Sequence, residues 1–281
     1  MRPTAPAPEI TPETAAAQSA GQDVPSSSGG CHCGSVRFTA AGPFREVVFC
    51  HCTQCRRTSG HYWAATSVPL DRFALAEARG LRWFRSSDAA ERGFCGDCGS
   101  SLFWKPAGER RMAIAAGAFD LPSGLAPGPH IFAGSAGDYY APEGPPPPFS
   151  GIAPGVLSCR CLCGGVVFTV EGPAGHVTAC HCSQCRKLSG HYSASFDADA
   201  ASLALSARAS LGEYPTPGGG VRGFCTGCGS SLWFRAADGT FSVEAGSVDG
   251  ATGGRLAAHI FVADKGDWYE LTDGLPQSDG G

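Results

Sequence analysis

The sequence predicts an all-β protein built from two tandem copies of one small domain. Two observations carry this prediction: a cysteine pattern that repeats after 130 residues, and short apolar segments separated by Gly, Pro, Ser or Asp. Glycine (40 residues) and proline (21 residues) make up about a fifth of the 281 residues, and only 16% are charged, which excludes a coiled coil or helix bundle. The length also allows two domains, because a domain typically has about 100–200 residues.

The expected strands of the first copy are four to seven residues long and follow one another closely. Each is rich in apolar or β-branched residues and ends at Gly, Pro, Ser or Asp, which is the rhythm of an all-β domain. In chain order the predicted strands are 36–40, 46–50, 62–68, 81–85, 92–95, 101–105 and 111–117. Between the second and third of them, the segment TQCRRTSG (53–60) favours a helical turn.

The repeat is defined by seven cysteines in each copy. Cys31, Cys33, Cys50, Cys52, Cys55, Cys95 and Cys98 recur as Cys161, Cys163, Cys180, Cys182, Cys185, Cys225 and Cys228. The text between them matches as well: CHCTQCRRTSGHY at 50–62 corresponds to CHCSQCRKLSGHY at 180–192, and PHIF at 129–132 corresponds to AHIF at 258–261. The domains are therefore expected at 29–140 and 157–274, and Cys159 is left outside the repeat.

The remaining segments have the composition of tails and a tether. Residues 1–28 have almost no large apolar side chain, so we expect a disordered tail there. Residues 141–156 contain a run of four prolines, which favours an extended, semi-rigid linker. Residues 275–281 are expected to form a second frayed tail.

Charge and hydropathy exclude several kinds of partner. The net charge of −4 supplies no basic stripe, so the sequence predicts no nucleic-acid partner. Apolar runs fall far short of the about 20 residues that span a bilayer, and no signal peptide follows Arg2, so we expect no membrane association and a cytoplasmic protein. Fifteen cysteines in such a chain more often bind metal than form disulfides. No oligomeric state is predicted.

Four cysteines of each copy have the spacing of a structural zinc site. On a strand, Cys31 and Cys33 point to one face and His32 to the other, and the same holds for Cys50, Cys52 and the intervening His51, so neither histidine is expected as a ligand. A Cys-x-Cys pair and a Cys-x-x-Cys-Gly knuckle together supply four thiolates, a closed tetrahedral set. The predicted structural sites are Cys31, Cys33, Cys95 and Cys98, and Cys161, Cys163, Cys225 and Cys228.

The other three cysteines of each copy predict a second kind of site. Cys50, Cys52 and Cys55, and in the second copy Cys180, Cys182 and Cys185, lie within six residues of one another. Three thiolates leave one position of a zinc ion open, as in catalytic sites. Because three thiolates leave the ion a soft and modest Lewis acid, a thiol substrate fits this position better than a peptide or phosphate ester.

Several alternatives stay open on the sequence alone. A buried side chain can close the second site and make it structural, and the candidates are His61, His191, His130 and His259. Redox cycling of the Cys-x-x-Cys pairs and an iron–sulfur cluster are further alternatives. Arg56 and Arg186 directly follow the third cysteine and are candidate clamps for a carboxylate, or solvated surface residues. The matched aspartates Asp120, Asp249, Asp138 and Asp267 are candidate general acids or turn formers.

The combined motifs resemble those of the glutathione-dependent formaldehyde-activating enzyme family, which includes the centromere protein V domain. The resemblance rests on Cys-x-Cys-Gly, Cys-His-Cys-x-x-Cys-Arg, Phe-Cys-x-x-Cys-Gly and His-Ile-Phe, in that order, over residues 29–140 and 157–270. It implies two tandem β-tent domains and up to four zinc ions per chain, two structural and two catalytic. The four-cysteine sets would hold the structural ions and the three-cysteine sets the catalytic ones. Tandem duplication departs from the usual single-domain form of this family.

The resemblance also implies a reaction. Glutathione, as co-substrate, would add to formaldehyde or another small aldehyde, a carbon–sulfur lyase reaction run backward. Proximity and activation of the thiol would supply the rate. Two other readings remain: a zinc-stapled binding or scaffold module that binds thiols without chemistry, and a thiol-based buffer of metal or aldehyde. Both sets of cysteines are complete, so neither copy is expected to have lost its sites.

Overall fold

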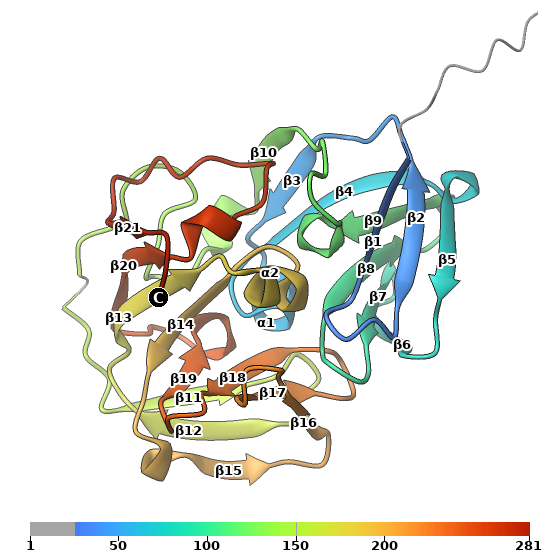
Figure 1. Ribbon diagram of the computed structural model, residues 1–281. Coiled ribbons are helices and arrows are strands. Elements are labelled where there is room, and N and C mark those ends of the chain that lie inside the picture. The colour runs from blue at the N-terminus through green and yellow to red at the C-terminus, as the bar shows by residue number, and fades with distance from the viewer. Residues whose placement is uncertain (1–25, 150) are drawn as a thin grey trace, which may run out of the picture.

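The computed structural model describes residues 26–149 and 151–281 and contains two similar β-rich halves (Figure 1). Each half combines a three-stranded sheet with a larger sheet of seven or eight strands. Only one α-helix occurs in the described part of each half. The predicted fold class, all-β with a tandem duplication and little helix, is therefore confirmed. No helix among the described residues is long and apolar enough to cross a membrane.

The first half forms two sheets and one helix. The small sheet has the order β1-β2-β5 and the large one β10-β3-β4-β9-β8-β7-β6, with β10 parallel to β3 and the other large-sheet pairs antiparallel. The elements are β1 (Ser26–Gly30), β2 (Arg37–Ala41), β3 (Val47–Cys50), α1 (Thr53–Ser59), β4 (Trp63–Pro69), β5 (Phe73–Glu77), β6 (Leu81–Ser87), β7 (Ala90–Cys95), β8 (Ser101–Pro106), β9 (Arg111–Ala115) and β10 (Pro127–Ile131). Each segment expected as a strand contains one, and the helical turn after Cys52 is confirmed as α1.

The second half repeats this arrangement with one additional strand. Its sheets have the orders β11-β12-β15 and β16-β17-β18-β19-β14-β13-β20-β21. The elements are β11 (Val156–Arg160), β12 (Val167–Glu171), β13 (Gly175–Cys180), α2 (Ser183–Ser189), β14 (Ser193–Asp197), β15 (Ala204–Ala207), β16 (Leu211–Pro215), β17 (Val221–Cys225), β18 (Ser231–Arg235), β19 (Phe241–Glu244), β20 (Gly254–Ile260) and β21 (Gln277–Ser278).

Aromatic side chains connect the two sheets of each half. In the first half the ring of Phe38, on the small sheet, lies 5.5 Å from that of Phe103 and 5.3 Å from that of Phe119, both edge to face. In the second half Phe168 packs edge to face on Trp233 at 5.0 Å. Such pairs add about 0.5–1.5 kcal/mol each beyond the area they bury. The core thus lies between the sheets, and the cysteine motifs lie at the strand ends around it.

The structure corrects the expected ends of the domains. Most of the tail expected at 1–28 lies outside the described residues, but Ser26–Gly30 forms β1 and pairs with β2. The frayed tail expected at 275–281 is wrong, because β21 pairs with β20 and the amides of His259 and Phe261 donate to the carbonyls of Pro276 and Gly280. These backbone bonds depend on a strand edge that is distant in sequence, which composition does not reveal.

The two halves pack against each other about a pseudo-twofold axis, with α1 and α2 adjacent at the centre (Figure 1). The amide of Gly117 donates to the carbonyl of Gly190 at 2.8 Å, and the amide of Gly246 donates to that of Gly60 at 2.7 Å. A Cβ atom at Gly117 or Gly246 would lie 2.3 or 2.4 Å from a carbonyl oxygen of the opposite half, so only glycine permits this approach. The contact is self-complementary, as in a symmetric dimer.

A buried network of tyrosines and histidines crosses this interface. The Tyr62 and Tyr192 hydroxyls lie 3.1 Å apart, and each also contacts the His Nε2 of the opposite half, His191 for Tyr62 and His61 for Tyr192. The Nε1–H of Trp268 donates to Nδ1 of His191 at 3.3 Å. Burial lowers the pKa of His61 and His191 well below the ordinary value, so both imidazoles are neutral and bridge the halves by hydrogen bonds.

Candidate metal centres and their cavities

The four-cysteine group of each half comes from two turns. Cys31 and Cys33 lie in the turn between β1 and β2, not on a strand as predicted, and Cys95 and Cys98 surround the turn between β7 and β8. Gly34 and Gly99 adopt positive φ angles of 82° and 77°, which let the chain reverse tightly at both places. The thiols still converge, because the turn brings them to one side. His32 points away and contacts the hydroxyl of Tyr214 instead.

The sulfur positions fit a zinc ion. Cys33 Sγ lies 3.6 Å from Cys31 Sγ and 3.7 Å from Cys95 Sγ, and the corresponding distances in the second half are 3.5 and 3.6 Å. A tetrahedron with zinc–sulfur bonds of about 2.3 Å has edges of about 3.8 Å. Backbone amides of Val36 and Val166 also donate to Cys31 and Cys161, which stabilises thiolate at these positions. The donor set and its spacing are those of a closed zinc site.

The three-cysteine group lies where β3 leads into α1 and, in the second half, where β13 leads into α2. Cys50 ends β3, Cys52 is the N-cap of α1, and Cys55 lies in its first turn, so the helix start brings the three sulfurs within 4.8 Å of one another. Hydrogen bonds from the Cys50 and Cys55 thiols lower the pKa of Cys52 to about 2. Cys182 receives the same bonds from its neighbours, with the same effect on its pKa. Each group thus favours a thiolate, the form that binds metal.

A buried arginine lies beside each three-cysteine group. Arg92, on β7, places Nη2 at 3.5 Å from Cys55 Sγ, and Arg222, on β17, places Nη2 at 3.0 Å from Cys185 Sγ. A guanidinium at this distance stabilises the negative charge that three thiolates collect. The sequence places both arginines three residues before the knuckle cysteine, in the repeated text RGFC.

Each three-cysteine group opens into a cavity. The first cavity has a volume of about 370 Å³ and is bounded by β3, β4, β8 and β9, and the second has a volume of about 840 Å³ over the equivalent strands. The four-cysteine groups line neither of them. The Phe103–Trp104 and Trp233–Phe234 pairs divide between two environments: Phe103 and Trp233 are buried, whereas Trp104 and Phe234 line the cavities. Neighbours on a strand point to opposite faces, and this alternation is the signal that identifies the cavity residues.

Phe132 and Phe261 line the two cavities from a strained backbone. Both have φ of 56°, in the left-handed region where a non-glycine residue is uncommon. They are the last residues of the repeated motif His-Ile-Phe. Such a conformation costs about 1–3 kcal/mol, and it recurs at equivalent positions of the two copies. This recurrence indicates that the backbone is held in this conformation to place a phenyl ring at the cavity.

The arginines expected to clamp a carboxylate lie elsewhere. Arg56 Nη1 donates to the carbonyls of Gly246 and Val248, and Arg186 Nη1 donates to those of Gly117 and Phe119. Both side chains are therefore engaged at the interface between the halves and line neither cysteine cavity. The helix turns each of them away from the sulfurs, and the guanidinium beside the sulfurs belongs to Arg92 or Arg222.

The candidate acids are also interface residues. Asp120 pairs with Lys187 and Asp249 with Arg57, while Asp138 binds Thr252 and Asp267 binds Ser123, each time in the other half. None of these four aspartates lines a cysteine cavity.

The histidines considered as fourth ligands belong to the interface too. His61 and His191 form the network around the tyrosines, and His130 and His259 contact His51 and His181. Among the described residues, each candidate metal group consists of cysteines alone. The three-cysteine groups therefore have no fourth protein ligand within this set.

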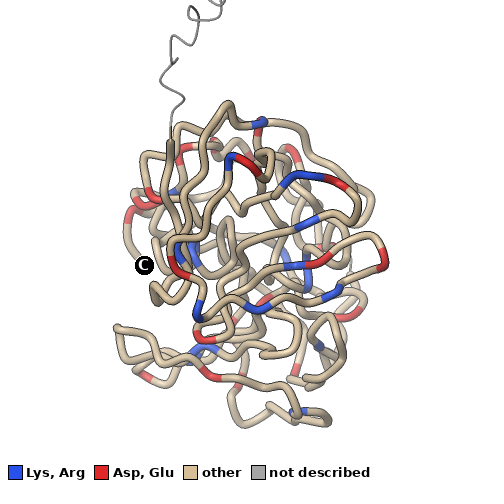
Figure 2. Tube along the Cα trace, turned by 90° about the vertical axis from the view of Figure 1, so that its right-hand side faces the viewer, with Lys and Arg blue, Asp and Glu red and all other residues tan. Residues whose placement is uncertain are grey.

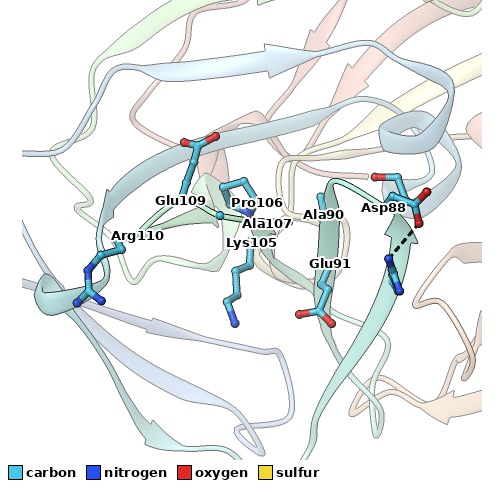
Figure 3. Close-up of a pocket in the computed structure, with 11 residues that line it drawn as sticks. Asp88, Ala90, Glu91, Lys105, Pro106, Ala107, Glu109 and Arg110 are labelled. Atoms are coloured by element: carbon cyan, nitrogen blue, oxygen red, sulfur yellow. Dashed lines mark hydrogen bonds and ion pairs between the residues drawn. The ribbon is translucent and has the colours of Figure 1, made fainter.

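A further cavity at the surface contains charged side chains and no cysteine. A cavity of about 550 Å³ at the outer end of β6–β8 is lined by charged side chains such as Glu91, Lys105 and the exposed Arg85–Asp88 pair, and contains no cysteine (Figure 3). Lys and Arg are interleaved with Asp and Glu along the chain in Figure 2 rather than gathered into a stripe.

Fold and site together define a duplicated β protein with two kinds of cysteine group that could hold a metal ion. The profile of the family described as glutathione-dependent formaldehyde-activating enzyme matches residues 26–135 and 156–264, and the chain belongs to this family. A crystal structure of a Rhodobacter sphaeroides protein is similar to this chain at 23% identity, covering 37% of this chain and 98% of that chain with a TM-score of 0.31.

Proposed function

We propose that the chain is a zinc-dependent carbon–sulfur lyase that joins or splits glutathione and a small aldehyde at its two three-cysteine centres. The observation that carries the proposal is the contrast between the two kinds of centre. In each half four sulfurs form a compact set with the spacing of a zinc tetrahedron, whereas three others face a cavity beside a buried arginine. A fourth position that faces a cavity is the arrangement of a catalytic ion.

The chain's own residues supply three things to this reaction. Zinc, when bound, would hold a substrate thiol at the fourth position and lower its pKa. Arg92 and Arg222 stabilise the charge of the cysteine sulfurs through Cys55 and Cys185. The cavity holds the small carbonyl compound next to the thiol, which replaces a bimolecular encounter by a positioned one.

The chemistry is a simple addition. The thiol sulfur forms a bond to the carbonyl carbon, and the thiol proton ends on the carbonyl oxygen, giving an S-hydroxymethyl adduct. The reverse reaction breaks the same carbon–sulfur bond. The lining of the first cavity contains no carboxylic acid, imidazole or phenol, so water has to carry the proton there. That observation favours, for the first half, the second candidate function: a thiol-binding module without catalysis.

The test begins with metal analysis and ends with turnover. Zinc-loaded protein is expected to hold four ions per chain, two released by a mild chelator and two retained. Glutathione is then titrated by calorimetry, and formaldehyde is added to follow adduct formation above the uncatalysed rate. The double variant Cys52→Ser/Cys182→Ser should lose thiol binding and turnover and keep two ions. Glutathione binding without turnover would support the second candidate function, the thiol-binding module. Absence of glutathione binding would refute both functions.

A further inference from the structure

The two cysteine cavities occupy the same place in their sheets but differ in their side chains. Trp63 is the strand partner of Cys50, and Ser193 is the partner of Cys180. One step further along the same strands, Ala65 lines the first cavity and Ser195 the second. The backbone frame is thus shared, while the lining changes from apolar to hydroxyl-bearing.

The same change recurs on the neighbouring strands. Val48 and Ala113 line the first cavity, and Thr178 and Ser242 stand at the equivalent ladder positions of the second. Thr178, Ser195 and Ser242 line the second cavity, where their hydroxyls can bind a ligand. Four substitutions of the same kind around one cavity amount to a change in the class of molecule that it accommodates.

The first cavity is lined by more arginines than the second. Arg45, Arg92 and Arg111 line it, and no Asp or Glu does. Burial and the charge of Arg111 lower the pKa of Arg45. Arg111 pairs with Glu109, whose side chain is 55% exposed, and its guanidinium lies 5.4 Å from the centre of the Trp104 ring. An exposed ion pair of this kind contributes about 1 kcal/mol or less.

A buried donor of the first cavity also lacks a partner. Among the described residues, Nε of Arg92 donates no hydrogen bond although the atom is buried, and the same holds for Nε of Arg222 beside the second cavity. An unsatisfied buried donor costs about 1–3 kcal/mol, which a ligand oxygen would recover. In the first cavity Trp104 and Phe132 supply apolar surface beside the guanidinium of Arg92. The first cavity therefore fits a molecule with a carboxylate and an apolar body.

In the second cavity a buried glutamate neutralises the corresponding arginine. Glu244 accepts hydrogen bonds from Arg222 at 3.3 Å and from Ser193 at 2.8 Å. Its counterpart in the first half is Ala115, because Ala65 pairs with Ala115 and Ser195 pairs with Glu244. Arg222 is the only Lys or Arg that lines the second cavity, so no uncompensated guanidinium remains there.

The sizes of the exchanged side chains compensate for one another. A Cβ atom at Gly60 would lie 2.7 Å from the Glu244 carboxylate, and one at the equivalent Gly190 would lie 2.8 Å from the Trp63 indole nitrogen. The indole and the carboxylate therefore occupy equivalent space. In the first half the large residue Trp63 lies next to the small residue Ala115. In the second half the small residue Ser193 takes the place of Trp63, and the larger residue Glu244 takes the place of Ala115. Such a paired exchange keeps the packing dense while changing the chemistry of the site.

We infer that the two three-cysteine centres, both of which take glutathione in the proposed function, differ in the other thiols that they prefer. The first prefers thiols, and their aldehyde adducts, that carry a carboxylate on an apolar body. The second, with its larger volume of about 840 Å³, prefers hydroxyl-bearing thiols without such a carboxylate and their adducts. This inference rests on the proposed function and assigns a substrate class to each of its two centres.

Calorimetry with two aliphatic thiols tests this assignment. The probes are 6-mercaptohexanoate and 1-thioglycerol, titrated into zinc-loaded full-length protein. Cys182→Ser leaves only the first centre competent, and Cys52→Ser leaves only the second. The ratio of the two dissociation constants is expected to differ at least about tenfold between the centres, with mercaptohexanoate favoured at the first. An equal ratio at both centres would overturn the inference and leave the proposed function standing.

Side-chain variants make the test specific. Arg111→Gln should weaken mercaptohexanoate binding at the first centre about three- to tenfold and leave thioglycerol unchanged. Arg79→Gln is the matched control, because Arg79 is exposed and pairs with a glutamate two residues before it, as Arg111 does. Ser195→Ala should weaken only thioglycerol at the second centre. If neither probe binds at either centre although glutathione does, this inference fails and the proposed function stands. If glutathione does not bind either, both fail.

Discussion

Replacing Cys95 by Ser tests the division between closed and open centres most directly. The closed centre ties the β1–β2 turn to the β7–β8 turn, and its Cys33–Cys95 contact spans 62 residues. Closing a loop of that length is worth about 4 kcal/mol in the chain-entropy relation. Structural zinc binding in finger peptides is worth about 10–16 kcal/mol, whereas a whole domain is stable by only about 5–15 kcal/mol. Cys95→Ser is therefore expected to unfold the first half.

Cys52→Ser is the matched change at the open centre. Cys52 is the N-cap of α1 and accepts the amide of Cys55 at 3.5 Å, a bond that serine replaces well because it is among the preferred N-cap residues. The expected change in unfolding free energy is less than about 1 kcal/mol.

Urea unfolding of zinc-loaded full-length variants, followed by tryptophan fluorescence and circular dichroism, measures both effects. Limited proteolysis then shows which half opens. Cys225→Ser and Cys182→Ser repeat the comparison in the second half. Equal unfolding midpoints for Cys95→Ser and Cys52→Ser would show that the two centres do not differ in structural role.

Three further predictions concern the interface and the cavity. Asp249→Asn removes the carboxylate beside the buried Arg57 and should lower the free energy of unfolding by about 1–3 kcal/mol. Asp88→Asn, at the exposed pair with Arg85, is the control and should change it by less than about 0.5 kcal/mol. Equal urea midpoints for the two variants would contradict this prediction. His61 and His191 stay neutral when folded, so below pH 6.5 only the unfolded chain gains their protons, and stability should fall by about 1.4 kcal/mol per pH unit for each. His61→Gln should reduce that slope in unfolding measured from pH 7.5 to 5.5, and an unchanged slope would refute the assignment. Phe132→Gly relieves a φ of 56° and should not lower stability, but it should weaken thiol binding at the first centre; earlier unfolding would show that its ring supports the fold instead.

The metal centres were predictable because their signals are local. Cys-x-Cys, Cys-x-x-Cys-Gly and the three cysteines around a helix start each bring sulfurs together within a single turn, so spacing alone groups them. The pairing of two such turns into one four-cysteine set followed from counting thiolates. The thiols of Cys31 and Cys33 lie on one side, as predicted, but for a different reason. A turn with Gly34 at positive φ brings them together, and not the alternation of side chains along a strand.

The roles of the charged residues were not predictable, because they depend on packing between the halves. Arg56 follows Cys55 directly, yet its partners Gly246 and Val248 lie 190 and 192 residues away. The same holds for Asp120 and Asp249, whose partners lie in the opposite copy. A repeat shows that two copies exist, but which faces of the copies meet is decided by shape complementarity over the whole surface.

By itself the sequence determined the fold class, the duplication and the four groups of cysteines, since strand-length apolar segments and ligand spacing are properties of short stretches of chain. The tertiary structure alone decided which side chains line the cavity of each three-cysteine group. Trp63 and Ala115 in one half, and Ser193 and Glu244 in the other, become neighbours only when β4 pairs with β9 and β14 pairs with β19. Cross-strand contacts of this kind join residues about 50 positions apart, and it is these contacts that set the chemistry of each site.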